Sequence, residues 1–502
     1  MDVQLPEFFT NFLDASLEKV YALEPVFEPT VVLVPDFLKE IVKYLADLIG
    51  FDVPTLSFTV AIYLCYVLGG LMNFIPAGKP RHIANILFGV FLMQFTVGVQ
   101  WMHQLVNAVV TYVMFLVLPR KTAAFAVPAF VMTYCVLGHL HRQYINYLGW
   151  DLDFTSSQMV ITQKLWMMAY NLYDGDLIAK GKESRAAKKC APFALKDLPD
   201  FIEYLGYVFS FTTVLSGPAY EFSIYKQACD GSHLYDANGK PQGEIPSNVW
   251  PTLRPFLLGL FSMAAFVVVG GAFPILDTED PQKNTPYVTS PEFLEKSIFY
   301  RYAYMWIGLW AVRQKYIMAW TNSEASNNIW YAGFEGFDDN GKAKGWDNAN
   351  NMGIWEFETA PNVQTMSKEW NKKTSLWLTR YVYIRTNGSL VAVYGMSAFW
   401  HGFYPGYYLF FLSVPLLTFC ERLGKKKISP YFSKEKWTPY GILCIISTSV
   451  ATEYMVAAFV LLALDRTFDY WKSMYFFGHI GCIVFYAVLS VMPTPKPKGK
   501  KA

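Results

Sequence analysis

The stretch SKEWNKKTSLWLTRYVYIRTNGSLVAVYGMSAFWHGFYPGYYLFF occupies residues 367–411 and decides how the rest of the chain is interpreted. It begins polar and basic, becomes apolar after Ser389, and then places His401 inside the apolar run. If residues 390–401 are helical, they rise about 16 Å, roughly half of the ~30 Å hydrocarbon thickness of a bilayer. An ionisable side chain at that depth is costly and faces protein or a water-filled cavity, so it is a functional-site hypothesis by default. His401 is therefore the leading candidate for the chemistry.

The composition is typical of a membrane protein. Of the 502 residues, 53% are hydrophobic and 16% are charged, whereas soluble domains carry about 25% charged residues. The apolar residues gather into long runs, which predict an all-α, polytopic helical membrane protein. The net charge of +2 argues against a nucleic-acid partner. The seven cysteines are scattered without a CxxC pair, so we expect neither a disulfide framework nor a zinc site.

Three segments follow from the pattern along the chain. Residues 1–50 are amphipathic rather than spanning, because apolar side chains recur at helical spacing between charged ones in residues 37–50. The N-terminus lacks a basic region followed by an apolar core, so we expect no cleaved signal peptide. Residues 51–492 form the multi-span domain, and residues 493–502 form a basic tail that we place in the cytosol.

Within the multi-span domain, the apolar runs predict about ten spans on the length criterion. The apolar run over residues 253–276 is the clearest single span. Residues 151–174 are expected to form a helix whose start is capped by Asp153, Thr155 or Ser156, and whose polar residues argue against a membrane span. Residues 298–320 contain Arg301, Arg313 and Lys315, so this segment is expected to face the bundle or a wet cavity. No internal repeat is present.

His401 and Asn371 have the chemistry of an acyl-transfer site. A neutral imidazole can take a proton from a hydroxyl, which suits a general base that activates an alcohol towards a carbonyl. Asn371 has both a donor and an acceptor, so it can orient the reacting groups or stabilise a developing oxyanion. The structural alternatives are that His401 hydrogen-bonds a backbone group in a packed bundle, and that Asn371 caps the start of a helix.

Several motifs together resemble the membrane-bound O-acyltransferase family, and more narrowly its lysophospholipid acyltransferases. SAFWHGFYPGYYLFF at 397–411 matches a WHG-xxx-GY-xxx-F pattern of the family, and WNKKTSLWLTRYVYIR at 370–385 precedes it. GPAYEF at 217–222, SEASNNIWYAGFEGF at 323–337 and FTSSQMVITQKL at 154–165 resemble other family segments. MSKEWN differs from the FYxDWWN-type segment of the sterol and diacylglycerol branch. Trp471 and Glu356 depart from the tyrosine and aspartate that are usual in the family.

The resemblance implies a fold and a mechanism. It implies an all-α bundle around a buried reaction chamber, in which His401 and Asn371 are the catalytic pair. Acyl-CoA enters from the cytosol as co-substrate, a lysophospholipid arrives through the bilayer, and His401 deprotonates the free glycerol hydroxyl for attack on the thioester. We expect no further cofactor and no metal. The expected substrate-binding residues are Trp370, Trp400, Ser397, Arg380, Tyr383, Arg385, Tyr407, Glu221 and Gln158.

We expect the protein to be a multi-pass protein of the endoplasmic reticulum membrane, and the sequence leaves its oligomeric state open. Two other functions remain. A member of this family can acylate another lipid alcohol or a protein. A membrane transporter would be a different class, but it would predict two related halves with paired discontinuous spans, a repeat that the sequence lacks.

Overall fold

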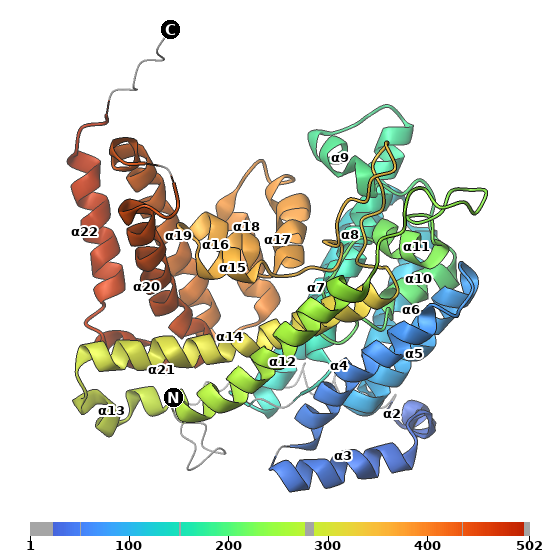
Figure 1. Ribbon diagram of the computed structural model, residues 1–502, viewed down its shortest axis with the longest axis horizontal. Helices are drawn as coiled ribbons and strands as arrows, with labels where there is room; N and C mark the ends of the chain where they lie inside the picture. Colours follow the sequence, from blue (N-terminus) through green and yellow to red (C-terminus); the bar gives the residue numbers. More distant parts are fainter. Residues whose placement is uncertain (1–23, 51, 150–151, 277–285, 434, 496–502) are drawn as a thin grey trace. The chain divides into compact units, whose positions relative to one another are not determined.

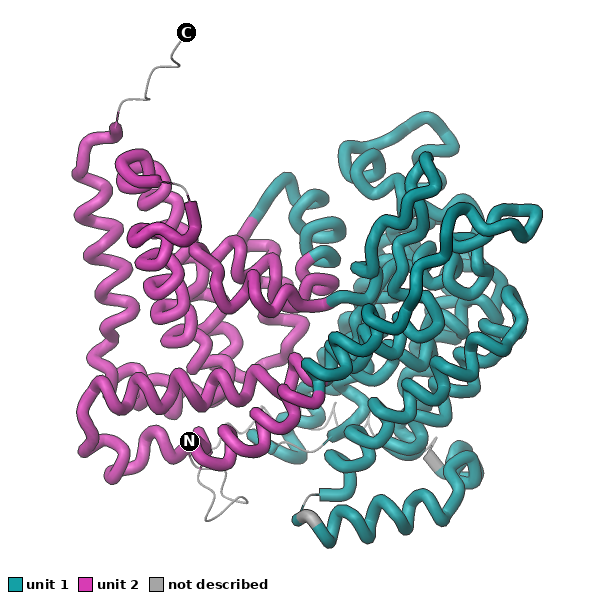
Figure 2. The backbone as a smooth tube through the Cα atoms, viewed as in Figure 1, with its two compact units in different colours: residues 1–259, 319–350, 376–389 teal, residues 260–318, 351–375, 390–502 magenta. Residues whose placement is uncertain are grey.

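The computed structural model describes residues 24–50, 52–149, 152–276, 286–433 and 435–495 (Figure 1). Within these ranges the regular structure is helical, and β-pairing is limited to three isolated bridges. The chain forms two compact units, which Figure 2 shows in different colours. Unit 1 comprises residues 1–259, 319–350 and 376–389, and unit 2 comprises residues 260–318, 351–375 and 390–502. The helical content confirms the predicted all-α class.

Most helices of unit 1 come from the first half of the chain. They are α2 (Glu24–Phe27), α3 (Asp36–Ile49), α4 (Val53–Met72), α5 (Lys79–Val97), α6 (Met102–Val117), α7 (Arg120–Ile145), α8 (Thr155–Ala179), α9 (Arg185–Cys190), α10 (Phe201–Val208), α11 (Phe222–Asp230) and the first part of α12 (Val249–Ala272). The end of α14 (Ile298–Ile329) and the π-helical turn η5 (Thr379–Tyr383) also belong to unit 1.

Unit 2 is built mainly from the second half of the chain. Its helices are the rest of α12 and most of α14, then α13 (Pro291–Glu295), α15 (Ile354–Glu358), α16 (Val363–Glu369), the start of α17 (Lys372–Leu378), α18 (Leu390–His401), α19 (Pro405–Lys427), α20 (Pro439–Leu461), α21 (Leu464–Ser473) and α22 (Phe477–Val491).

Helix α8 lies in the interior of unit 1, because most of its residues are buried. The N-cap position is held by Phe154, which makes no side-chain cap, rather than by one of the three predicted residues. Asp153, one residue earlier, still accepts the backbone N–H of Thr155 at 2.9 Å. Even the buried Lys164 is satisfied, since its ammonium donates to Tyr207 O at 3.0 Å and to Thr213 Oγ1 at 2.7 Å. Burial of a charged side chain is tolerated here because hydrogen bonds replace the water that it loses.

Unit 2 packs around α14, α19, α20 and α21, with Tyr454, Met455 and Trp471 in its core. The predicted inward orientation of the cations in α14 is confirmed for Arg301 and Arg313, which are both buried. Arg313 pairs with Glu453 and with Glu358, and the second of these contacts is 3.2 Å long. A buried arginine is stable only with such partners.

Fewer helices meet the criteria for a membrane span than the hydropathy runs predicted. Among the described residues five helical segments are long and apolar enough, namely α4, α5 with α6, α7, α12 and α20. The count becomes six if α21 and α22, which meet at a 68° bend, form one broken span. The expected number of about ten counted every apolar run. Helices such as α8 and α14 are long, but they hold charged side chains that pair inside their units.

Both ends of the chain extend beyond the described residues. Helix α3 covers the predicted amphipathic stretch, but residues 1–23 of the 1–50 segment lie outside the described part. Of the predicted basic tail at 493–502, residues 496–502 likewise lie outside it.

Candidate functional site

His401 is the last residue of α18, and aromatic rings surround its imidazole. The helix is mostly apolar, with Ser397 as the main polar exception before His401, and Gly402 follows it with a φ of 114°, a left-handed value that favours glycine. The imidazole centroid lies 5.6 Å from the ring of Tyr407, 5.6 Å from Phe411 and 5.0 Å from Phe459. His401 is half-buried, so the rings limit its contact with solvent without sealing it.

The second glycine of the motif allows α19 to approach α20 closely. The backbone N–H of Gly406 donates to Leu462 O at 2.6 Å. A Cβ atom on Gly406 would lie only 2.1 Å from the carbonyl oxygen of Ala458, so no larger residue fits without a shift. This contact holds Tyr407, one residue later, against the imidazole of His401.

Three of the predicted substrate-binding residues share these two helices with His401. Trp400 and Ser397 are buried on α18, and the indole of Trp400 lies 4.7 Å from the imidazole. Tyr407 is half-buried on α19.

Asn371 belongs to the same unit as His401 and lies just before α17. Its φ is 46°, a left-handed conformation that asparagine tolerates better than most residues. Its carbonyl accepts the N–H of Ser375 at 2.9 Å, as expected at a helix start. The first two amides of α17, however, donate to Asn351 rather than to the Asn371 side chain. Asn371 therefore stands where a capping residue would stand, while Asn351 does the capping.

Trp370 precedes Asn371 and packs among aromatic side chains of unit 2. Its ring lies 6.0 Å from Tyr316 and 5.2 Å from Phe357. The ring of Phe357 is also contacted by the guanidinium of Arg313, at 5.2 Å. Trp370 therefore packs on a ring that itself rests against the buried Arg313.

The predicted arginines lie in unit 1 and already have carboxylate partners. Arg380 Nη1 lies 2.9 Å from Glu221 Oε1, and its guanidinium is 4.1 Å from the ring of Phe193. Arg385 donates to both oxygens of Asp174, at 3.2 and 2.6 Å. Such bidentate pairs are the strongest type of ion pair in proteins. In this structure both arginines pair with carboxylates of unit 1, and their role towards a substrate stays a prediction.

The remaining predicted residues are also in unit 1. Glu221 is buried, and Tyr381 and Asn171 donate to its carboxylate at 2.9 and 2.8 Å. Gln158 is fully buried on α8 and accepts a hydrogen bond from Asn107 at 3.2 Å. Tyr383 ends η5 and is exposed. The predicted site residues are therefore divided between the two units.

Sequence reasoning missed two residues at these positions. Asn351 follows two other amides in a polar insertion, and nothing in that run indicates contact with a residue twenty positions later. Asp174 ends the predicted helix at 151–174, and only the charge of Arg385 could have indicated a partner for it.

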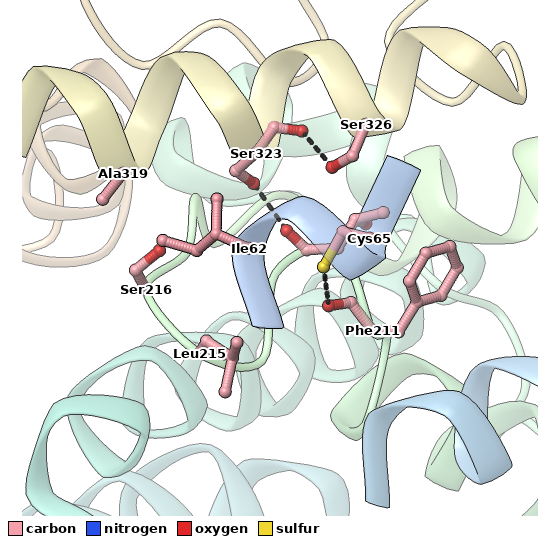
Figure 3. A pocket seen from close by; sticks show the side chains of 9 residues that line it. Ile62, Cys65, Phe211, Leu215, Ser216, Ala319, Ser323 and Ser326 are labelled. Carbon is pink, nitrogen blue, oxygen red and sulfur yellow. Dashed lines mark hydrogen bonds between the residues drawn. The ribbon is translucent and has the colours of Figure 1, made fainter. Parts of the chain in front are cut away.

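A small pocket lies wholly within unit 1 and contains none of the predicted site residues (Figure 3). It is lined by residues of α4, of the segment after α10 and of α14, and Ser323 donates across it to the carbonyl of Thr212 at 2.5 Å. It has room for about one water molecule, far too little for a fatty acyl chain.

Comparison with known proteins places this chain in a family. A family model described as MBOAT, membrane-bound O-acyltransferase family, matches residues 108–453, which include both Asn371 and His401. The human "Membrane-bound glycerophospholipid O-acyltransferase 1" is 31% identical over 427 residues, covering 82% of this chain and 83% of that protein.

Two further relatives agree. The rat "Membrane-bound glycerophospholipid O-acyltransferase 2" is 30% identical over 430 residues, covering 83% of this chain and 80% of that protein. The "Lysophospholipid acyltransferase" of Schizosaccharomyces pombe is 26% identical over 471 residues, covering 89% of this chain and 88% of that protein. The resemblance drawn from the motifs is confirmed, and the chain belongs to the membrane-bound O-acyltransferase family.

Proposed function

We propose that this protein is a lysophospholipid acyltransferase, which transfers a fatty acyl group from acyl-CoA to the free glycerol hydroxyl of a lysophospholipid. The observation that carries the proposal is the half-buried imidazole of His401 inside its aromatic surround, at the centre of the family's WHG motif. The names of the relatives in rat, human and fission yeast support a glycerophospholipid acceptor.

In the proposed reaction His401 acts as the general base. It takes the proton of the glycerol hydroxyl while the oxygen attacks the thioester carbonyl carbon. The carbon–sulfur bond then breaks, the new ester forms, and the coenzyme A thiolate recovers the proton from the imidazolium. Holding donor and acceptor together at one imidazole removes much of the entropy cost of a two-substrate reaction. The proposal needs no metal and no cofactor beyond the co-substrate.

Location forms part of the proposal. The chain is a multi-pass membrane protein, and we propose that its membrane is the endoplasmic reticulum. Fractionation of cells that express the tagged protein tests this, since enrichment in another membrane would contradict it.

Replacing His401 tests the general base. We expect His401→Gln to lower the acyl transfer rate at least 100-fold, because general-base catalysis contributes about 10²–10⁴-fold. His479→Gln makes the same change elsewhere in unit 2, where His479 binds Tyr454 and Ser413 at 3.0 and 3.2 Å. This control should keep activity within a few-fold of wild type. Comparable rates for His401→Gln and wild type would refute the assignment.

An acceptor panel tests the substrate class. Purified enzyme with labelled acyl-CoA should acylate lysophospholipids and leave diacylglycerol and a serine-containing peptide unmodified. Transfer to either of the latter two, without transfer to a lysophospholipid, would favour the other branches of the family. Solute transport by liposomes without any acyl transfer would favour a transporter.

A further inference from the structure

Asn351 is joined to the Asn371 segment by three hydrogen bonds. Its backbone carbonyl accepts the N–H of Lys372 at 2.8 Å, and its side-chain Oδ1 accepts the N–H of Lys373 at 3.0 Å. Its Nδ2 donates to Oδ1 of Asn371 at 3.1 Å. Asn351 is only 1% exposed, so these contacts are protected from water. All four residues belong to unit 2.

The order of these bonds fixes the direction of both side-chain amides. A backbone N–H is always a donor, so the atom of Asn351 that faces Lys373 must be its carbonyl oxygen. The other end of that amide is therefore the NH₂ group, which is always a donor. Its partner on Asn371 must then be an acceptor, namely Oδ1. The end of the Asn371 amide that does not face Asn351 is consequently NH₂.

We propose that Asn351 is a positioning residue, which holds the side chain of Asn371 so that it presents its NH₂ group to the reaction. This inference rests on the proposed function, in which the thioester carbonyl oxygen gains negative charge as the glycerol oxygen attacks. An amide NH₂ stabilises that charge, whereas an amide oxygen would repel it. Of the two roles expected for Asn371, orienting the reacting groups or stabilising an oxyanion, its contact with Asn351 favours the second.

The backbone contacts of Asn351 serve the same purpose. Asn371 has a left-handed φ of 46°, which places strain on any residue with a side chain. By accepting the next two amides, Asn351 secures the helix start that follows and holds Asn371 in that conformation. The same residue thus fixes the backbone of Asn371 and the direction of its amide.

The substitution Asn351→Asp separates positioning from folding. One carboxylate oxygen can still accept the N–H of Lys373, so the helix start is preserved. The other oxygen cannot donate, and it instead attracts the NH₂ group of Asn371, which turns the amide by half a rotation. We expect kcat to fall about 10²–10³-fold, the usual loss for a missing oxyanion donor. The KM values for acyl-CoA and for lysophospholipid should stay within threefold of wild type.

Asn362→Asp is the matched control. Asn362 also lies in unit 2 and caps α16 by accepting the N–H of Thr365 at 2.8 Å. The control should keep full activity, because this cap has no contact that orients Asn371. Wild-type kcat in Asn351→Asp, or raised KM values with kcat unchanged, would overturn the proposal.

A second variant tests the inference without touching Asn351. In Asn371→Asp one carboxylate oxygen can still accept from Asn351, but the NH₂ group is replaced by an acceptor. If Asn371 works as a donor, this variant should lose as much kcat as Asn371→Ala, and retention of activity would overturn the inference. His401→Gln is measured alongside, because its activity reports on the proposed function. An inactive His401→Gln with an active Asn371→Asp would reject only the role of Asn351.

Discussion

At the scale of single residues, Asp174 and Arg385 form a buried ion pair in unit 1. The side chain of Asp174 is fully buried and that of Arg385 is 12% exposed, with two hydrogen bonds between them. Removal of one partner leaves the other charge buried and unpaired, which costs about 3–5 kcal/mol. We predict that Asp174→Ala lowers the midpoint of thermal unfolding in detergent by several degrees.

The matched control for this prediction lies two residues away on the same helix. Asp176 pairs with Lys180 near the surface, and both side chains are more exposed than those of the buried pair. Asp176→Ala should change stability by less than about 1 kcal/mol. Equal unfolding midpoints for the two variants would show that the ion pair between Asp174 and Arg385 does not stabilise the fold. The guanidinium of Arg385 would then be available to an anionic substrate, as predicted from the sequence.

His401 was predictable from the sequence because an ionisable residue is unusual in an apolar run. Glu221 was a candidate only through the resemblance of GPAYEF at 217–222 to a segment of the family. Asn351 did not stand out, because an asparagine in a polar insertion is ordinary. The role proposed for Asn351 depends on its hydrogen bond to Asn371, twenty residues later. A contact between separate segments cannot be predicted from the composition around either residue.

At the scale of elements, α3 exposes an unusual amount of apolar surface. Phe37, Ile41, Tyr44 and Leu48 recur at helical spacing and are all exposed. Val42 and Ala46 on another side of the same helix are buried, and its charged residues lie along a third side. A helix with an exposed apolar stripe beside a charged one is typical of the membrane interface. We therefore predict that α3 lies in the plane of the interface.

Thiol labelling tests this orientation. In opened membrane vesicles, Leu48→Cys should be protected from a membrane-impermeant maleimide, whereas Lys43→Cys on the charged side should react. Background labelling should be low, because five of the seven native cysteines are buried and the other two are partly buried. Equal labelling at the two positions would contradict an interfacial α3.

Elements were predictable where a single physical signal governed them. Helix α12 follows from hydropathy alone, and α3 from periodicity. Helix α8 could be predicted as a helix, but its burial in unit 1 could not be predicted, because polar residues are typical of an exposed helix. Those polar residues are buried because distant backbone carbonyls and side chains satisfy them, as Thr213 satisfies Lys164.

At the scale of the whole molecule, the proposed substrates reach the enzyme from two phases. The described part of the chain contains five or six helical segments able to span a bilayer, so the protein is embedded in lipid, and a lysophospholipid dissolves in that same lipid. Acyl-CoA carries phosphates and a large polar group, so it arrives from water. The rate should therefore depend on the mole fraction of lysophospholipid in the membrane, but on the bulk concentration of acyl-CoA.

Dilution experiments on purified enzyme in vesicles or mixed micelles test this prediction. Added inert phospholipid at constant bulk lysophospholipid should lower a subsaturated rate in proportion to the mole fraction. Diluting the whole suspension at constant mole fraction and constant acyl-CoA should leave the rate per enzyme unchanged. His401→Gln provides the baseline for acyl transfer that does not depend on the site. A rate that follows bulk lysophospholipid and ignores its mole fraction would mean that the acceptor enters from water, and the proposed lateral route would be wrong.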